Sequence, residues 1–232
     1  MYIKVLFPYF ICLGLGLIPT GSNSERSLDY EIVYGNKPVG QLSFTIDENQ
    51  FNEKINIFSK ISGSPLGLRD GTYNMSSNVL KSSKNGNTWY ESNKNTAISS
   101  RSTVIKSQNK KILEVKIQPK SERTYLSSNV TKIDDFYNPA QALSKVLTFP
   151  CSKEFQVYDG RRLIQILPTP EKTNLKCSYS YQITRGPGHL PPLHLKKFKI
   201  IVHREDKNTN IGNYIIFKKF LSTLYLIETD AE

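Results

Sequence analysis

The sequence predicts a mainly β protein, built as a single curved antiparallel sheet or a partial β-barrel with one or two helices. Short segments in which apolar and polar residues alternate recur along the chain, and turn residues separate them. One segment has the apolar spacing of a convincing helix. Many short strands with few helices favour one antiparallel sheet that curves or closes on itself.

Residues 1–24 are typical of a secretory signal peptide. Lys4 supplies a positive start, residues 5–18 are mostly apolar, and small and polar residues follow from Thr20. The apolar run is shorter than the roughly 20 residues that span a bilayer, and an uncleaved anchor is the alternative. We therefore expect one β-rich domain over residues 25–232, in the periplasm or secreted.

The chain is strongly basic, with 31 Lys and Arg residues against 20 Asp and Glu and a formal net charge of +11. Basic proteins are attracted to phosphate groups, anionic lipid headgroups and acidic polymers. The charges are scattered along the sequence, however, and a solvated surface is the alternative explanation. Since export also separates the protein from its genome, we expect no nucleic-acid partner.

The N-terminal half predicts an antiparallel meander. Apolar residues alternate in residues 28–46, on either side of a turn at 35–38, and again in residues 51–61. The same alternation predicts further strands over residues 72–80, 88–92, 98–106 and 111–118, and a weaker one over 123–126. Trp89 lies in one of these strands and is expected in the core.

The predicted helix begins near Asn138 and ends before Pro150. Asp135 or Asn138 can cap it, and Pro139 suits the first helical turn. One face is apolar, with Ala142, Leu143, Val146 and Leu147. After the helix, alternation predicts a hairpin and then strands over residues 175–184, 193–203 and 214–228.

The strongest hairpin signal is the dipeptide Asp159-Gly160. Apolar residues alternate on both sides of it, at Phe155, Val157, Ile164 and Ile166. Asp-Gly tolerates the positive φ angles of a type I′ turn, so Tyr158 and Arg161 are expected to face each other across the strands.

Two cysteines flank this hairpin, Cys151 and Cys177, and the third, Cys12, lies within the predicted leader. In an oxidising compartment, an even pair favours a disulfide. A zinc site is less favoured because no histidine lies near either cysteine.

The turn and its neighbours are the candidate binding residues: Tyr158, Asp159, Gly160, Arg161 and Arg162. The functional interpretation is a contact with an anion or a partner. The alternative is a solvated turn with flanking charges, because surface charges often contribute little.

The chain carries no recognisable motif for a reaction, a metal or a cofactor. Its histidines lack the spacing of a zinc site, and Ser107–Lys110 matches S-x-x-K without the elements that accompany it in enzymes. His189 lies in a Pro- and Gly-rich loop, where it is either a functional base or an ordinary loop residue. We therefore expect a protein that is not an enzyme and has no metal or cofactor.

The following sequence features occur in this order along the chain: Tyr30, Gly35 and Gly40, the helix start Asn138-Pro139-Ala140-Gln141-Ala142-Leu143, Cys151, the segment Tyr158-Asp159-Gly160-Arg161-Arg162, and Cys177 before Tyr179 and Tyr181. This order resembles the proteobacterial exported family catalogued as domain of unknown function 3108. That family has a D-P-x-S-A-L helix start, a Cys, an F/Y-D-G-R turn and a later Cys. The resemblance implies a periplasmic, Gram-negative setting and a β-rich fold, and it brings no established activity.

The expected function is binding of a hydrophobic or anionic envelope component, such as lipid, with peripheral membrane contact. The alternative is a secreted interaction protein that acts on a host or envelope partner. An open apolar cavity would favour the first function, whereas a filled core with an exposed patch would favour the second.

Overall fold

The computed structural model describes residues 24–62, 70–80, 86–97, 99–130, 133–169, 173–189, 196–205, 211–219 and 222–229. The predicted signal peptide lies outside these residues, except for Ser24, which begins the first strand. Residues 63–69, 81–85, 190–192 and 206–210, which lie between predicted strands, are also outside them. So are parts of three predicted strands, at residues 98, 193–195 and 220–221. None of the helices in the described part of the chain has the length and apolar character that a membrane crossing requires.

The described residues form fourteen strands and three short helices. The strands are β1 (Ser24–Tyr34), β2 (Lys37–Glu48), β3 (Asn52–Ile61), β4 (Gly71–Leu80), β5 (Asn87–Thr96), β6 (Ser99–Gln108), β7 (Lys111–Gln118), β8 (Phe136–Tyr137), β9 (Phe155–Tyr158), β10 (Leu163–Thr169), β11 (Lys176–Arg185), β12 (Lys197–His203), β13 (Tyr214–Lys219) and β14 (Ser222–Glu228). The helices are η1 (Lys120–Glu122), α1 (Tyr125–Ser128) and α2 (Pro139–Leu147).

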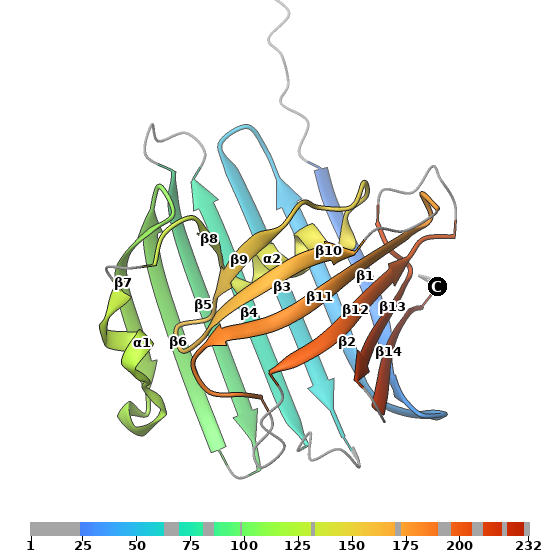
Figure 1. The fold of residues 1–232 in the computed structure, drawn as a ribbon, viewed down its shortest axis with the longest axis horizontal. Helices are drawn as coiled ribbons and strands as arrows, with labels where there is room; N and C mark the ends of the chain where they lie inside the picture. Colours follow the sequence, from blue (N-terminus) through green and yellow to red (C-terminus); the bar gives the residue numbers. More distant parts are fainter. Residues whose placement is uncertain are drawn as a thin grey trace, which may run out of the picture.

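All fourteen strands belong to one sheet, in the order β7-β6-β5-β4-β3-β2-β1-β14-β13-β12-β11-β10-β9-β8. Neighbouring strands are antiparallel except β8 and β9, which are parallel. The sheet curls into a nearly closed barrel, so that β1–β7 form one layer and β9–β14 lie in front of it in Figure 1. The predicted fold class, a curved antiparallel sheet or partial barrel with few helices, is confirmed.

Helix α2 lies between the two layers (Figure 1) and fills part of the barrel. Its Asn138 cap accepts a hydrogen bond from the Gln141 backbone N–H at 3.0 Å and donates from Nδ2 to Ser77 Oγ of β4 at 2.8 Å. Asn138 is only 1% exposed, so one side chain both begins the helix and ties it to the sheet. Of the two predicted caps, Asn138 is the one used.

The predicted hairpin of β9 and β10 is present, and Cys151 is bonded to Cys177 as a disulfide. The predicted turn is wrong, however. The last cross-strand pair is Tyr158 with Leu163, so the turn has four residues instead of two. The Asp159 carboxylate accepts backbone hydrogen bonds from Arg161 and Arg162, which favours this longer turn.

Two further predictions fail for local reasons. The weak strand over residues 123–126 is instead the start of α1, because the Thr124 N–H donates to Ser127 Oγ at 3.0 Å and this local bond begins a helical turn. Trp89 is 46% exposed, since its neighbour Tyr90 occupies the inward position of β5. The Lys106 ammonium lies 4.4 Å from the centre of the outward Trp89 ring.

Candidate functional site

Inward side chains are most completely buried in the middle of the strands and are only partly buried toward both ends of the barrel. Inward side chains such as Ile57, Ile105 and Val202 are almost completely buried. At the end that carries the β9–β10 turn, which we call the turn end, many inward side chains are only partly buried. They are Tyr34, Leu42, Tyr73, Met75, Tyr181, Phe198, Phe217 and Leu224.

Three aromatic rings from the strands β11 to β13 line one side of the turn end. The rings of Tyr181 and Phe198 are stacked, with centres 4.0 Å apart and planes at 16°. The ring of Phe217 follows, 6.2 Å from that of Phe198. We call Tyr181, Phe198 and Phe217 the aromatic wall; it presents apolar surface that the protein itself does not fully cover.

The opposite side of the turn end is polar. Leu42, Ser59, Tyr73, Lys94 and Arg101 are paired in register across β2 to β6, and they face the same side of the sheet as the core residues. The last two members of this row are therefore cations at inward positions, where alternation normally places apolar residues.

The β9–β10 turn brings further charges to this end. Asp159 Oδ2 lies 2.7 Å from Nη1 of Arg162, and Arg162 Nε donates to the carbonyl of Pro187 at 2.8 Å. Arg162 is only 7% exposed. The Asp159–Arg162 ion pair is therefore largely buried, and it holds the turn together.

The turn is held against its surroundings by buried hydrogen bonds. The Tyr158 hydroxyl donates to the Leu126 carbonyl at 2.7 Å, and Ser127 Oγ donates to the Gly160 carbonyl at 2.8 Å. Thr124 Oγ1 donates to the Arg161 carbonyl at 3.0 Å. The segment around α1 therefore fixes the backbone from which Arg161 projects.

Arg161 meets two charged groups from other parts of the chain. One oxygen of Glu122, Oε2, lies 3.2 Å from Arg161 Nη2 and 3.2 Å from Arg101 Nη1. Burial acts to raise the pKa of Glu122, but the charges of Arg161 and Arg101 outweigh it and lower that pKa. We call Arg101, Glu122 and Arg161 the guanidinium cluster.

Arg161 is incompletely satisfied within this cluster. Its Nε is buried and has no hydrogen-bond acceptor among the described residues. Burial, and then the charge of Arg101, lower the pKa of the Arg161 guanidinium. An additional anion near this group would therefore be stabilised.

His189 lies beside the same charges, with Nε2 2.6 Å from the Tyr181 hydroxyl. Burial, followed by the charge of Arg162, lowers the pKa of His189 to about 4. Burial also raises the pKa of Tyr181. Both groups are consequently neutral near pH 7.

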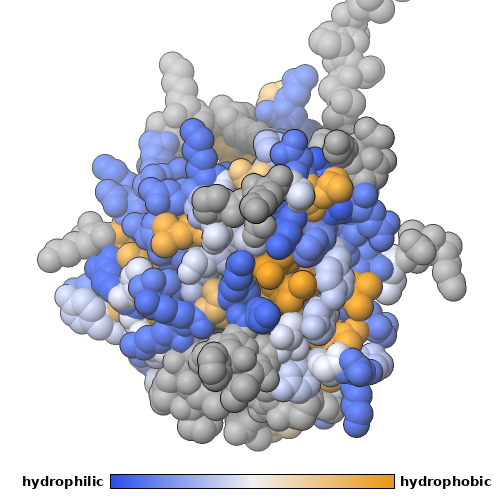
Figure 2. Space-filling view, turned by 45° about the vertical axis from the view of Figure 1, so that its right-hand side comes forward, coloured by the Kyte–Doolittle hydropathy of each residue, from blue (hydrophilic) through white to orange (hydrophobic). Residues whose placement is uncertain are grey.

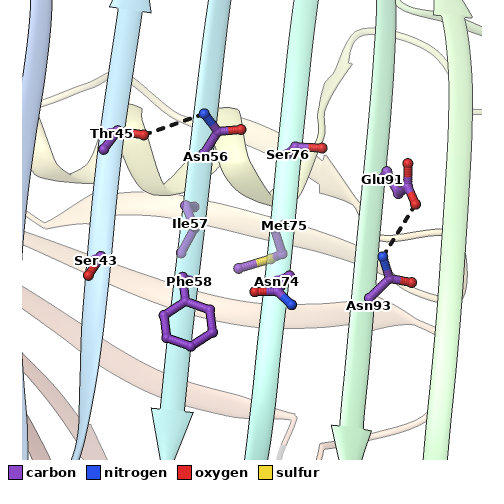
Figure 3. Close-up of a pocket in the computed structure, with 10 residues that line it drawn as sticks. All are labelled: Ser43, Thr45, Asn56, Ile57, Phe58, Asn74, Met75, Ser76, Glu91 and Asn93. Carbon is purple, nitrogen blue, oxygen red and sulfur yellow. Dashed lines mark hydrogen bonds between the residues drawn. The ribbon is translucent and has the colours of Figure 1, made fainter.

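A hollow of about 300 Å³ opens on the outer face of β2 to β5 (Figure 3). Its side chains are mainly hydroxyls and amides; Asn56 donates to Thr45 and Asn93 to Glu91. Phe58 is exposed beside them. On the face shown in Figure 2, hydrophobic residues form small separate patches among hydrophilic ones.

Within the described ranges, no three His, Cys, Asp or Glu side chains gather in a group that could hold a metal ion. Another hollow lies near α2 and β9; in it, Lys110 forms an ion pair with Asp135 and lies over the Tyr137 ring. Its lysines and carboxylates are balanced, so it offers no excess charge to a ligand.

Known families and solved structures show little similarity to this chain. No family model matches the chain, and no curated protein matches it. A crystal structure described as a β-barrel-like protein of domain of unknown function DUF1849, from Brucella abortus, is similar over 88% of this chain and 95% of the other. The TM-score is 0.37 and the identity 7%, a likeness that does not assign the chain to that family.

The resemblance to domain of unknown function 3108 is not supported, because no family model matches the chain. The features that suggested it have local structural roles here. Asn138 caps a helix, Cys151 and Cys177 form a disulfide, and Asp159 stabilises a turn.

The predicted binding residues are consecutive in the sequence, but the structure gives them different environments. Tyr158 is completely buried and Gly160 packs on β6, whereas Asp159 and Arg162 pair with each other. Arg161 is the one directed to another group of charges. Sequence reasoning missed Arg101 and Glu122; the signal for Arg101 was a cation at an inward position of a strand.

Proposed function

We propose that the protein is an exported, non-enzymatic binder of a hydrophobic or anionic envelope component, such as a lipid, which it binds at the turn end of the barrel. The observation that carries this proposal is the partial exposure of inward side chains there: an aromatic wall on one side and cations on the other. Ligand sites combine an apolar lining with a few placed polar groups. The disulfide is consistent with export.

The environment of His189 favours a binding role over catalysis, because general bases that act near pH 7 usually have a pKa close to that pH. His189 is the residue on which an enzyme hypothesis would depend, and its pKa is lowered to about 4 while its partner Tyr181 has a raised pKa. A lipid, by contrast, needs only apolar surface and a site for its headgroup.

The experiment is native mass spectrometry of gently purified, exported protein, with lipid extraction of the same sample. Phe198→Gln makes the aromatic wall polar, and Phe58→Gln is the matched control on the outer face. We expect a bound lipid or apolar molecule in the parent protein and the control, and a several-fold lower amount in Phe198→Gln. A parent protein that stays free of ligand, even after incubation with lipid micelles, would refute the proposal.

The second candidate function is interaction with a host or envelope protein. It is favoured by the outer hollow, where Phe58 is 43% exposed among mainly polar side chains. A photo-crosslinking amino acid at Phe58 tests it in intact cells: a discrete protein adduct would support an interaction protein, and its absence together with bound lipid would leave the first function.

A further inference from the structure

The guanidinium cluster has more positive charge than its carboxylate can balance. Arg101 and Arg161 share a single oxygen of Glu122, at 3.2 Å each. The neighbouring Asp159 is occupied by Arg162, which it contacts at 2.7 Å. Among the described residues, three guanidiniums thus face two carboxylates. Their side chains are partly shielded from solvent, which weakens screening by salt.

The cluster also has an unused hydrogen-bond donor. Arg161 Nε is buried and has no acceptor within the described part of the chain. A buried donor without an acceptor is unfavourable, and native proteins rarely leave one unexplained. An acceptor oxygen supplied by a ligand would remove this cost and balance the positive charge at the same time.

A phosphate group is the anion that suits these donors. Arg presents several N–H groups in a planar fork, and two forks from Arg101 and Arg161 can engage different oxygens of one phosphate. Lys94 precedes Arg101 in the inward row and acts electrostatically on the same carboxylate, Glu122. The surroundings therefore favour a ligand with several oxygens and more than one negative charge.

Charges at the turn end act electrostatically on Tyr181 of the aromatic wall and on its neighbour His189. His189 is influenced electrostatically by Arg101, Arg161 and Arg162, and its ring lies 5.6 Å from that of Tyr181, the first residue of the aromatic wall. A ligand with a phosphate and an apolar part can thus reach both features.

We infer that Arg101 and Arg161 bind the phosphate group of an amphiphile whose apolar part lies on the aromatic wall. This inference rests on the proposed function, which it makes specific by naming the headgroup. Arg162 and Asp159 hold the turn, and Glu122 keeps the two binding guanidiniums oriented while no ligand is bound.

The test compares two soluble ligands that differ only in the phosphate: dihexanoyl phosphatidic acid and dihexanoylglycerol. Binding to the full exported protein is measured by calorimetry for the parent protein, Arg161→Gln, Arg101→Gln and the control Arg26→Gln. Arg26 is exposed and pairs with Ile46 on β2, far along β1 from the turn end, so its replacement removes one charge without touching the cluster.

We expect the parent protein and Arg26→Gln to bind the phosphatidic acid at least about tenfold more tightly than dihexanoylglycerol. A tenfold difference in affinity is about what one charge-assisted hydrogen bond contributes. Each cluster variant should lose most of this preference and keep its affinity for dihexanoylglycerol. Because Arg101 and Arg161 lie on separate segments, failure of one variant to fold leaves the other as a test.

Equal affinity for the two ligands, or a preference that survives both cluster variants, would overturn the inference while leaving lipid binding intact. Failure of both ligands to bind would refute the proposed function itself. Inorganic phosphate serves as the third probe: if it binds as tightly as the phosphatidic acid, the ligand is free phosphate and the assignment to an amphiphile is wrong.

Discussion

Replacing Gly160 by Ala tests whether the β9–β10 turn is fixed by its packing on β6. Gly160 has φ +87°, and a Cβ built on it lies 2.8 Å from Cγ2 of Thr103, closer than carbon atoms can approach. Gly35 provides the matched control, since it has φ +62° but no atom within 4 Å of its Cβ position. Both substitutions place Ala at a positive φ angle and so carry a cost in backbone conformation. Gly160→Ala adds a steric clash, which Gly35→Ala lacks.

The expected magnitudes follow from these two terms. A left-handed conformation costs a non-Gly residue about 1–2 kcal/mol. Ala also lowers the entropy of the unfolded chain, which offsets part of this cost, so Gly35→Ala should lower the free energy of unfolding by about 1 kcal/mol. Overpacking adds about 1–3 kcal/mol, so Gly160→Ala should lose about 2–4 kcal/mol. Thr103→Ser, which removes the clashing methyl group from a residue that is 2% exposed, should cost about 1 kcal/mol alone.

The assay is urea unfolding of the two Gly variants, Thr103→Ser and the double variant Gly160→Ala/Thr103→Ser. If the clash is real, the double variant is more stable than the sum of the single losses predicts, by about 1–2 kcal/mol. Additive losses, or equal losses for Gly160→Ala and Gly35→Ala, would show that the turn does not pack on β6 as described.

Three further predictions concern the groups around this turn. The pKa of His189 falls from 6.5 in the unfolded chain to about 4 on folding, so the unfolded chain binds the proton first as the pH drops. The free energy of unfolding should therefore be retained above pH 6.5 and fall by about 2 kcal/mol between pH 7 and pH 5. Urea unfolding at several pH values measures this dependence, which should be weaker in His189→Gln. Tyr158→Phe leaves the buried Leu126 carbonyl without its 2.7 Å donor and should cost about 1–2 kcal/mol, and an unchanged urea midpoint would count against that bond. Reducing Cys151–Cys177, whose sequence separation is 26, should cost about 3 kcal/mol; two free thiols in non-reducing mass analysis of exported protein would contradict the pairing.

Most of the sheet could be predicted because strand alternation is a local property. In β3, the residues Ile55, Ile57 and Ile61 are buried at alternating positions, as the sequence pattern indicates. The helix was equally accessible, because the Asn138 cap and the following Pro139 act within one turn. Each of these signals is contained in fewer than about ten residues, so no knowledge of distant contacts was needed.

The failures arise where a distant contact or a competing local bond decides the conformation. Trp89 and Tyr90 are adjacent aromatic residues, and alternation alone does not say which of them faces inward. The Asp159 carboxylate turns a predicted two-residue hairpin into a four-residue turn, since it binds two backbone N–H groups and the Arg162 guanidinium. The strength of the contact between Asp159 and Arg162 depends on how deeply the pair is buried, and burial cannot be read from the sequence alone.

The guanidinium cluster shows why a site of this kind is hard to find from sequence and what signal remains. Its members come from a strand, a short helical turn and a hairpin turn, and curling of the sheet brings them together. The remaining signal is a violation of pattern: Lys94 and Arg101 occupy inward positions, next to each other in register, where a stable core would place apolar residues. Departures of this kind cost stability and are expected where function requires them. The inward cations, more than the predicted Asp-Gly turn, therefore mark the part of the barrel at which a ligand should be sought.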